Sequence, residues 1–195
     1  MWYEARVPIR ALLCPPSPSR GVSLRETIQD LNEAAEDRYW EAYELAVQGQ
    51  PYGAMYLFGY VAEMFLKSAG FLFDGASLND QVGPRLGPAK VFGSSHFSHV
   101  HCESYHSILF WAEFLIEKRA RAASGRAGPV PFPVPLASEL RIRAMRIHQR
   151  WMVEMRYRSP RVPPLRGSSI SIGDELLQLM EDVSWMRDNH SKFWR

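Results

Sequence analysis

The chain has 195 residues, of which 46% are hydrophobic and 12% aromatic, and its formal net charge is +2. This composition is typical of a globular protein with one core and excludes a disordered or collagen-like chain. Only Cys14 and Cys102 are present, which excludes a disulfide framework. The first residues also lack the basic and then apolar pattern of a secretory signal, so we expect a cytoplasmic protein.

Residues 1–22 favour an extended N-terminal arm over a helix. Apolar and charged residues alternate as far as Pro8, and the stiff segment Cys14-Pro-Pro-Ser-Pro-Ser follows. From residue 23 onward the pattern changes to helical periodicity. We therefore expect residues 23–195 to form a single helical-bundle domain.

The first helix is predicted to begin at Ser23-Leu-Arg-Glu26, which has the spacing of a capping box. Apolar residues recur every three or four positions from there to Leu45, and Gly49 suits the end of the helix. Pro51 then suits the first turn of a second helix. Because the link between the two helices is short, we expect them to form an antiparallel hairpin.

The second helix, residues 51–73, is apolar on every side, which predicts that other helices surround it. Glu63 and Lys67 are its two charged residues, and their spacing of four places them on one face. They are either a structural ion pair at the rim of the bundle or the mark of a functional pocket. Two charges near the middle of the segment argue against a membrane span, so we expect no membrane partner.

The remaining chain is predicted to contain a long loop and three further helices. The third helix carries an apolar stripe and ends in basic residues before Gly125, and a proline-rich connector separates it from the fourth. Acidic residues in its first turn mark the start of the last helix. The expected segments are the loop 74–97, a helix from Ser98 or Ser104 to Ala123, the connector 128–135, a helix over 136–157 and a C-terminal helix over 173–190.

Charge is distributed unevenly along the chain. Residues 118–166 hold twelve basic and two acidic side chains, whereas residues 23–50 hold seven acids and two arginines. The two segments can pack against each other, or the basic one can bind a polyanion. Since Arg141, Arg146 and Arg150 lie off the apolar ridge of the fourth helix, we expect that face to bind RNA or a nucleotide, with an affinity that falls as salt rises.

The same helix contains a histidine that suits ribonuclease chemistry. Arg141 and His148 are seven residues apart and share a face, whereas Arg143 and His148 point about 140° apart on the helical wheel. A histidine can move a proton while an arginine stabilises a charged phosphorane. The alternative is an ordinary basic helix face with a hydrogen-bonded histidine.

Four histidines and a cysteine lie within eleven residues, at His96, His99, His101, Cys102 and His106. Histidine and cysteine are the ligands that zinc prefers, but a structural zinc site usually joins two separated ligand pairs, and a second pair is missing from this sequence. We therefore expect no metal site, and no cofactor is implied.

The segment Trp151-Met-Val-Glu-Met-Arg-Tyr-Arg158 closes the fourth predicted helix with the pair Arg156-Tyr157. This pair either caps the last carbonyl groups of the helix or meets the face that carries Glu63 and Lys67. We favour the second interpretation, because both segments are polar at a position that faces the core.

Several of these residues together resemble the HEPN-domain family. The helix Ala54-Met-Tyr-Leu-Phe-Gly-Tyr-Val-Ala-Glu-Met-Phe-Leu-Lys67, preceded by an acidic helix, is similar to the second helix of that family. The ending at Arg156-Tyr157 is similar to the close of a later HEPN helix, and His99 or His101 matches a histidine often found before the third helix. The resemblance covers about residues 23–158.

The resemblance implies a bundle of four or five helices, usually dimeric, that cleaves RNA or binds a nucleotide. It implies a toxin–antitoxin or phage-defence role, beside a nucleotidyltransferase partner. The implied pocket contains Glu63, Lys67, His99, Arg156 and Tyr157. The ribonuclease branch carries an arginine, a polar residue, several further residues and a histidine; Arg143-Ala-Met-Arg-Ile-His148 has this spacing with alanine in the polar place.

The sequence thus predicts an all-α bundle and leaves three functions open. The first is RNA or nucleotide binding through the basic face, the second is a metal-independent endoribonuclease, and the third is a non-catalytic protein-interaction module. We also expect a homodimer, because the apolar central helix, the arm and the C-terminal Trp185, Phe193 and Trp194 offer much adhesive surface.

Overall fold

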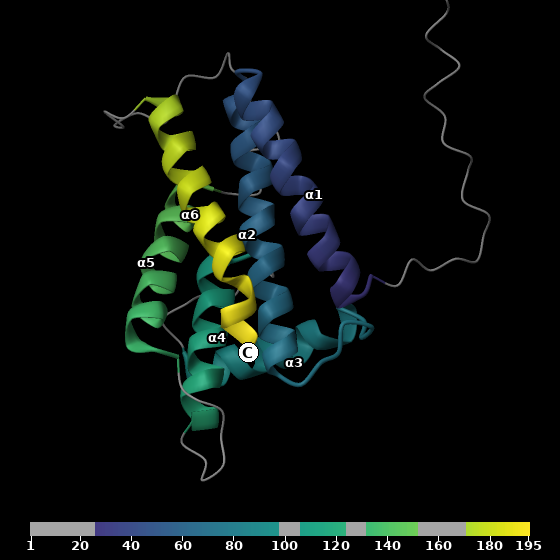
Figure 1. Ribbon diagram of the computed structural model, residues 1–195. Helices are drawn as coiled ribbons and strands as arrows, with labels where there is room; N and C mark the ends of the chain where they lie inside the picture. The colour runs from purple at the N-terminus through teal and green to yellow at the C-terminus, as the bar shows by residue number, and fades with distance from the viewer. Residues whose placement is uncertain (1–25, 98–105, 124–131, 152–170) are drawn as a thin grey trace, which may run out of the picture.

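The computed structural model describes residues 26–97, 106–123, 132–151 and 171–195, and within these ranges the chain is all α-helical. Figure 1 shows the helices, which are α1 (Ile28–Val47), α2 (Pro51–Phe73), α3 (Gly83–His96), α4 (Ile108–Ala123), α5 (Val134–Arg150) and α6 (Ile172–Trp194). The all-α prediction is confirmed. The expected arm, residues 1–22, lies outside the described residues.

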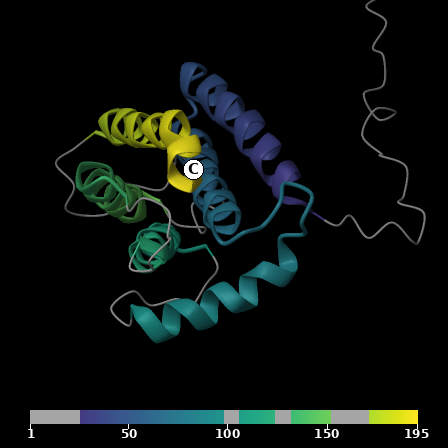
Figure 2. The same ribbon diagram turned by 60° about the horizontal axis from the view of Figure 1, so that its bottom comes forward.

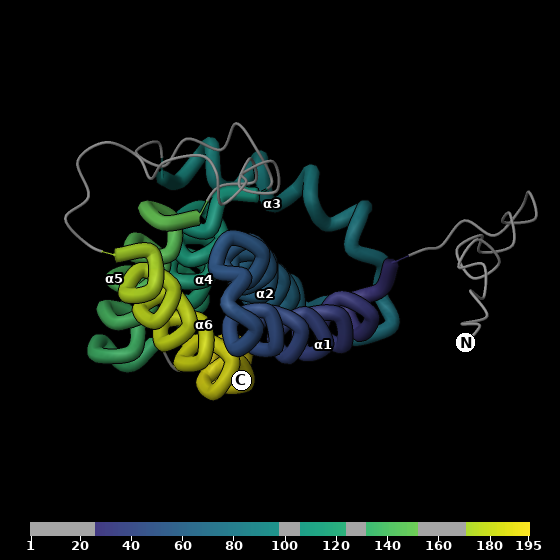
Figure 3. The backbone as a smooth tube through the Cα atoms, turned by 90° about the horizontal axis from the view of Figure 1, so that it is seen from above, coloured from purple at the N-terminus to yellow at the C-terminus, as the bar shows by residue number. Residues whose placement is uncertain are grey.

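The helices are arranged around α2. It packs against α1, α6 and α4, while α5 packs against α4 and α6, and α3 lies across one end of the bundle against α4 (Figure 2). Seen from above, α1 and α5 lie on opposite sides of α2 (Figure 3). The acidic first helix and the basic fifth helix are therefore not neighbours.

α2 is the core helix that its sequence predicts, with the expected bounds. Fourteen of its 23 residues are buried, including Phe58, Phe65 and Phe71. Two glycines let other elements come close: a Cβ on Gly59 would lie 2.0 Å from the indole of Trp151, and one on Gly70 would lie 3.0 Å from the Phe114 ring. The apolar surface of α2, one of the features that led us to expect a homodimer, is largely covered by other helices of the same chain.

The hairpin of α1 and α2 starts later in the sequence than predicted, whereas the turn between the two helices is as predicted. α1 begins at Ile28 and not near Ser23, because Thr27 and Asp30 form the capping box. Thr27 Oγ1 accepts from the Asp30 amide at 3.1 Å, and the Asp30 carboxylate accepts from the Thr27 amide at 2.9 Å. At the turn, Gly49 takes a left-handed φ of 71°, and Pro51 follows in the first turn of α2.

The expected loop over 74–97 is wrong, because half of it forms α3. This helix buries only Ala89 and Gly93. It contacts α4 through aromatic rings: the ring centres of Phe92 and Phe114 lie 5.4 Å apart, edge to face. The preceding turn is attached to α1 by backbone hydrogen bonds, including Ile28 N to Asp80 O at 3.0 Å. The loop therefore carries a short helix across the end of the bundle.

The later helix boundaries also need correction. α4 begins at Ile108, later than Ser98 or Ser104. α5 ends at Arg150 instead of continuing to residue 157, because Trp151 adopts an extended backbone with φ −117° and ψ 136°. α6 is longer than 173–190 and reaches Trp194, with Phe193 fully buried. Within the described part of the chain, every helix is too short or too polar to cross a membrane.

Candidate functional site

The exposed face of α5 carries arginines that are held by buried acids. On the side toward α4, Arg141 Nε donates to Glu113 Oε1 at 2.5 Å and its Nη2 donates to Oε2 at 2.8 Å. These two parallel bonds raise the pKa of Arg141 above its usual range. The Glu113 carboxylate is largely buried, whereas the Arg141 side chain is 51% exposed.

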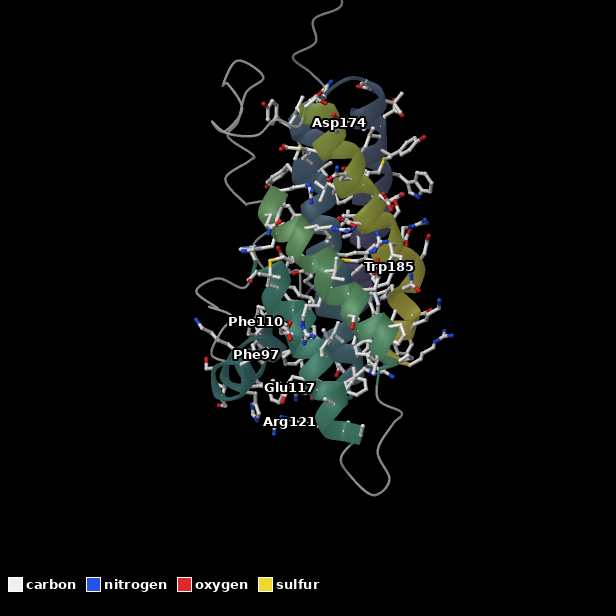
Figure 4. All side chains as sticks on the ribbon, turned by 90° about the vertical axis from the view of Figure 1, so that its left-hand side faces the viewer. Phe97, Phe110, Glu117, Arg121, Asp174 and Trp185 are labelled. Carbon is white, nitrogen blue, oxygen red and sulfur yellow. The ribbon has the colours of Figure 1, made fainter. Side chains whose placement is uncertain are left out.

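On the opposite side of α5, a carboxylate of α6 faces two arginines. Arg143 Nη1 lies 3.0 Å and Arg146 Nη1 lies 3.4 Å from Asp182 Oδ1. Arg143 also donates to Glu139 at 2.6 Å and lies 5.0 Å from the Trp185 ring centre, which Figure 4 shows on α6 beside α5. Burial of Asp182 raises the pKa of its carboxyl, and the arginines lower that pKa in turn.

A small cleft opens between α5 and α6 above this acid. It has a volume of about 250 Å³ and is lined by Arg146, Gln178, Glu181 and Asp182. Arg150 donates to the Gln178 amide oxygen and, at 3.1 Å, to the Arg146 carbonyl. The cleft lining therefore combines one guanidinium group with an amide and two carboxylates, and Arg150 bonds to that amide.

Most of the described basic residues of the segment 118–166 form ion pairs with acids that lie outside α1. Lys118 pairs with Asp74 at 2.5 Å, Arg121 pairs with Glu117 at 2.7 Å, and the arginines of α5 pair with acids of α4, α5 and α6. The alternative in which this segment packs against α1 is therefore wrong for the described residues of α5, since α1 and α5 lie apart. Five basic residues of the segment (126, 156, 158, 161 and 166) lie outside the described residues.

His148 lies on the exposed face of α5, and partial desolvation lowers its pKa below the usual value. Arg141 contacts α4 and Arg143 contacts α6, so the two arginines leave α5 on opposite sides. By its spacing of seven, His148 belongs to the Arg141 side. Among the described residues, His148 has no hydrogen bond to either arginine.

A second cluster surrounds Glu63 on α2. Its buried carboxylate pairs with Lys67, as expected, and both carboxylate oxygens also lie 3.0 Å from His106 Nδ1. The Lys67 ammonium lies 5.6 Å from the centre of the Trp111 ring. No local sequence pattern indicates this contact, because His106 is 43 residues from Glu63.

Of the segment 151–158, the structure describes only Trp151, which packs on α2 near the Glu63 face. Trp151 Nε1 donates to the Tyr56 carbonyl at 3.0 Å, and its ring lies 5.4 Å from that of Tyr60. Tyr60 in turn lies 5.9 Å from the His106 ring. The remaining members of the expected pocket, His99, Arg156 and Tyr157, lie outside the described residues. Within the described ranges, no cluster of three or more His, Cys, Asp or Glu side chains could hold a metal ion.

No family profile, curated protein or solved structure matches this chain. The HEPN resemblance accordingly remains a prediction from the sequence.

Proposed function

We propose that the exposed face of α5 binds the phosphate groups of RNA or of a nucleotide. The observation that carries this proposal is that ion pairs hold Arg141 and Arg146 in place while both side chains stay exposed. Each guanidinium is held by a largely buried carboxylate, yet the two side chains are 51% and 49% exposed. A guanidinium that is already ordered loses less conformational entropy when it binds an anion.

The arginines keep donors for a ligand. Guanidinium has five N–H groups, and the bonds to Glu113 use only the Nε and Nη2 groups of Arg141. The bond to Asp182 uses only Nη1 of Arg146. Arg150 lies one turn beyond Arg146 and donates to Gln178, so these two arginines form a donor row on the α6 side of α5, opposite Arg141. A phosphate that meets this row would receive charge-assisted hydrogen bonds from two or more side chains.

The paired acids limit how strongly α5 can attract a polyanion. Glu113, Glu139 and Asp182 cancel much of the arginine charge, so few phosphates can be neutralised there. With about two phosphate contacts, the logarithm of the affinity should fall by roughly 1.4 per tenfold rise in salt for a single strand. The ligand that fits best is a nucleotide or a short single-stranded RNA.

The test is a binding measurement with a fluorescent single-stranded RNA of about ten nucleotides. The double variant Arg146→Ala and Arg150→Ala should bind about tenfold more weakly, the equivalent of about 1.4 kcal/mol. A matched control is Arg38→Ala with Arg121→Ala, because both arginines are exposed and form ion pairs within their own helices, away from the cleft. Equal affinities in all three proteins, or an equal loss in both variants, would contradict the proposal.

A second candidate function is metal-independent cleavage of RNA. Arg141 and His148 share a side of α5, and the lowered pKa keeps His148 neutral at pH 7, as a general base must be. Incubation of the protein with RNA in EDTA should then give fragments. His148→Ala should abolish the fragments and leave RNA affinity unchanged. Intact RNA with the parent protein would restrict the function to binding.

The HEPN resemblance supplies a biological setting for this proposal. In that setting the protein acts as a homodimeric component of a toxin–antitoxin or phage-defence system, beside a nucleotidyltransferase. Support comes from the sequence motifs and from the helical hairpin that carries the Glu63–Lys67 pair. Light scattering at high micromolar concentration tests the dimer: a mass of 22.4 kDa, that of one chain, would rule it out.

A further inference from the structure

The outer face of α1 carries an exposed aromatic and aliphatic row. Trp40, Tyr43 and Val47 are 55%, 44% and 68% exposed. Their spacings of three and four place them along one side of the helix, over about two turns. Single exposed apolar side chains are common on protein surfaces, but an ordered row of this kind marks an interaction surface.

Negative charge flanks the row along one side. α1 contains six acids and one basic residue, Arg38, which pairs with Glu41. Glu33, Asp37 and Glu44 are exposed, and the hydrogen-bond partners that Glu33 and Glu44 have are the neutral amides of Gln29 and Gln48. We call these three acids, with Trp40, Tyr43 and Val47, the α1 stripe.

The edge of the stripe already holds one guanidinium. Arg187, from α6, lies 4.8 Å from the ring centre of Tyr39 and 5.3 Å from that of Trp40. Its Nε donates to Glu36 at 2.8 Å. The surface thus accommodates a cation between an aromatic face and a carboxylate, which is the arrangement in which an arginine binds best.

The charge of the stripe decides between possible occupants. RNA and anionic membranes would be repelled by the acids. A second copy docked through its own α1 would set acid against acid, which costs affinity. In a second copy, Glu113, Glu139 and Asp182 offset the charge of Arg141, Arg143 and Arg146, so the α5 face attracts an acidic stripe less strongly than a basic segment without such acids. The remaining occupant is a cationic segment with apolar side chains on one face.

We propose that the α1 stripe docks a basic amphipathic helix of a partner protein. Apolar residues of the partner, spaced by three and four, pack on Trp40, Tyr43 and Val47. Its arginines or lysines meet Glu33, Asp37 and Glu44. Helix-on-helix docking of this kind uses a short row of apolar anchors with a charged rim. This interaction is independent of the phosphate-binding proposal, because the stripe belongs to α1, and α1 and α5 lie on opposite sides of α2 (Figure 3).

The experiment uses two fluorescent helical peptides of about 14 residues, or four turns. Both carry leucines at one face, and one carries Arg and Lys elsewhere while the other carries Glu. The basic peptide should bind the full chain, and the acidic one should bind at least tenfold more weakly. Equal binding of the two peptides would overturn the proposal.

Variants locate the contact. Trp40→Ala with Tyr43→Ala should weaken the basic peptide by about tenfold, as loss of aromatic anchors does. Ile142→Ala with Met145→Ala is the matched control, since these side chains are comparably exposed on α5. Glu33→Gln, Asp37→Asn and Glu44→Gln together should weaken binding and reduce its salt dependence.

Two results would reject the assignment. One is an unchanged affinity in the Trp40 and Tyr43 variant. The other is self-association of the parent protein that the same variant abolishes, which would assign the stripe to a second copy of the chain. Sedimentation of both proteins without peptide measures this directly.

Discussion

Gly59 shows how a single missing side chain makes room for Trp151, the residue that follows α5. A Cβ at this position would lie 2.0 Å from Trp151, whose indole is fixed by its bond to the Tyr56 carbonyl. We predict that Gly59→Ala lowers the free energy of unfolding by about 3 kcal/mol, because Trp151 must leave its place. Gly173→Ala is the control: its nearest atom is 3.7 Å away, and urea unfolding should show no loss.

His190 gives the fold a dependence on pH. Burial lowers its pKa to about 4, and its Nε2 lies 2.8 Å from Ser68 Oγ. The unfolded chain takes up this proton near pH 6.5, whereas the folded chain does so only near pH 4. The free energy of unfolding should therefore fall between pH 6.5 and pH 4, by about 3 kcal/mol from this group.

The measurement is urea unfolding of the parent and of His190→Gln at pH 7 and pH 4. Since carboxylates titrate in the same range, the informative quantity is the difference between the two proteins. The variant should lose less stability on acidification than the parent. His96→Gln, at an exposed histidine of α3, should keep the parent's full dependence. Parallel curves for the parent and His190→Gln would contradict the assignment.

At the scale of elements, Asp182 joins α5 to α6. Its side chain is 2% exposed and faces Arg143 and Arg146, and its Oδ2 has no hydrogen-bond partner among the described residues. Asp182→Ala should lower the free energy of unfolding by about 3 kcal/mol, because the largely buried Arg143 loses an acid. Glu181→Ala, next along α6 and 74% exposed, should change it by less than about 0.5 kcal/mol.

The helices that the sequence predicted well are those whose signals agree with each other. α2 has Pro51 at its start and apolar residues on all sides, and its bounds are as expected. α3 was missed because Gly83, Pro84, Gly87 and Pro88 favour a loop, and only packing against α4 decides otherwise. α5 was predicted too long because Trp151 continues the apolar spacing, although its backbone is extended.

The candidate site was predictable only where its partners lie on one helix. Glu63 and Lys67 are four residues apart, so their pairing followed from helix geometry. The partners of Arg141, Arg143 and Arg146 on α4 and α6 lie 28 to 39 residues away, and no local pattern indicates them. Counting charges along one segment therefore overstated how much positive charge the α5 face presents.

For the whole molecule, burial predicts an order of local stability. α2 packs against three other helices and contributes the most buried residues of any described helix. α3 buries two residues, and its one extensive contact with another described helix is with α4. Hydrogen exchange followed by mass spectrometry should show the slowest amides at residues 55–69 and faster exchange over α3. Equal protection of the two segments would mean that α3 unfolds only with the whole bundle.

The packing of α6 against α2 also matters while the protein is being made. A chain that emerges from the ribosome N-terminus first presents residues 51–73 long before residues 172–194 arrive to cover them. The nascent helical hairpin must keep one side of α2 exposed throughout that interval, which is when a chain is most open to aggregation. Chaperones that recognise apolar helices would find their binding site on this side of α2, and it would vanish as soon as α6 docked.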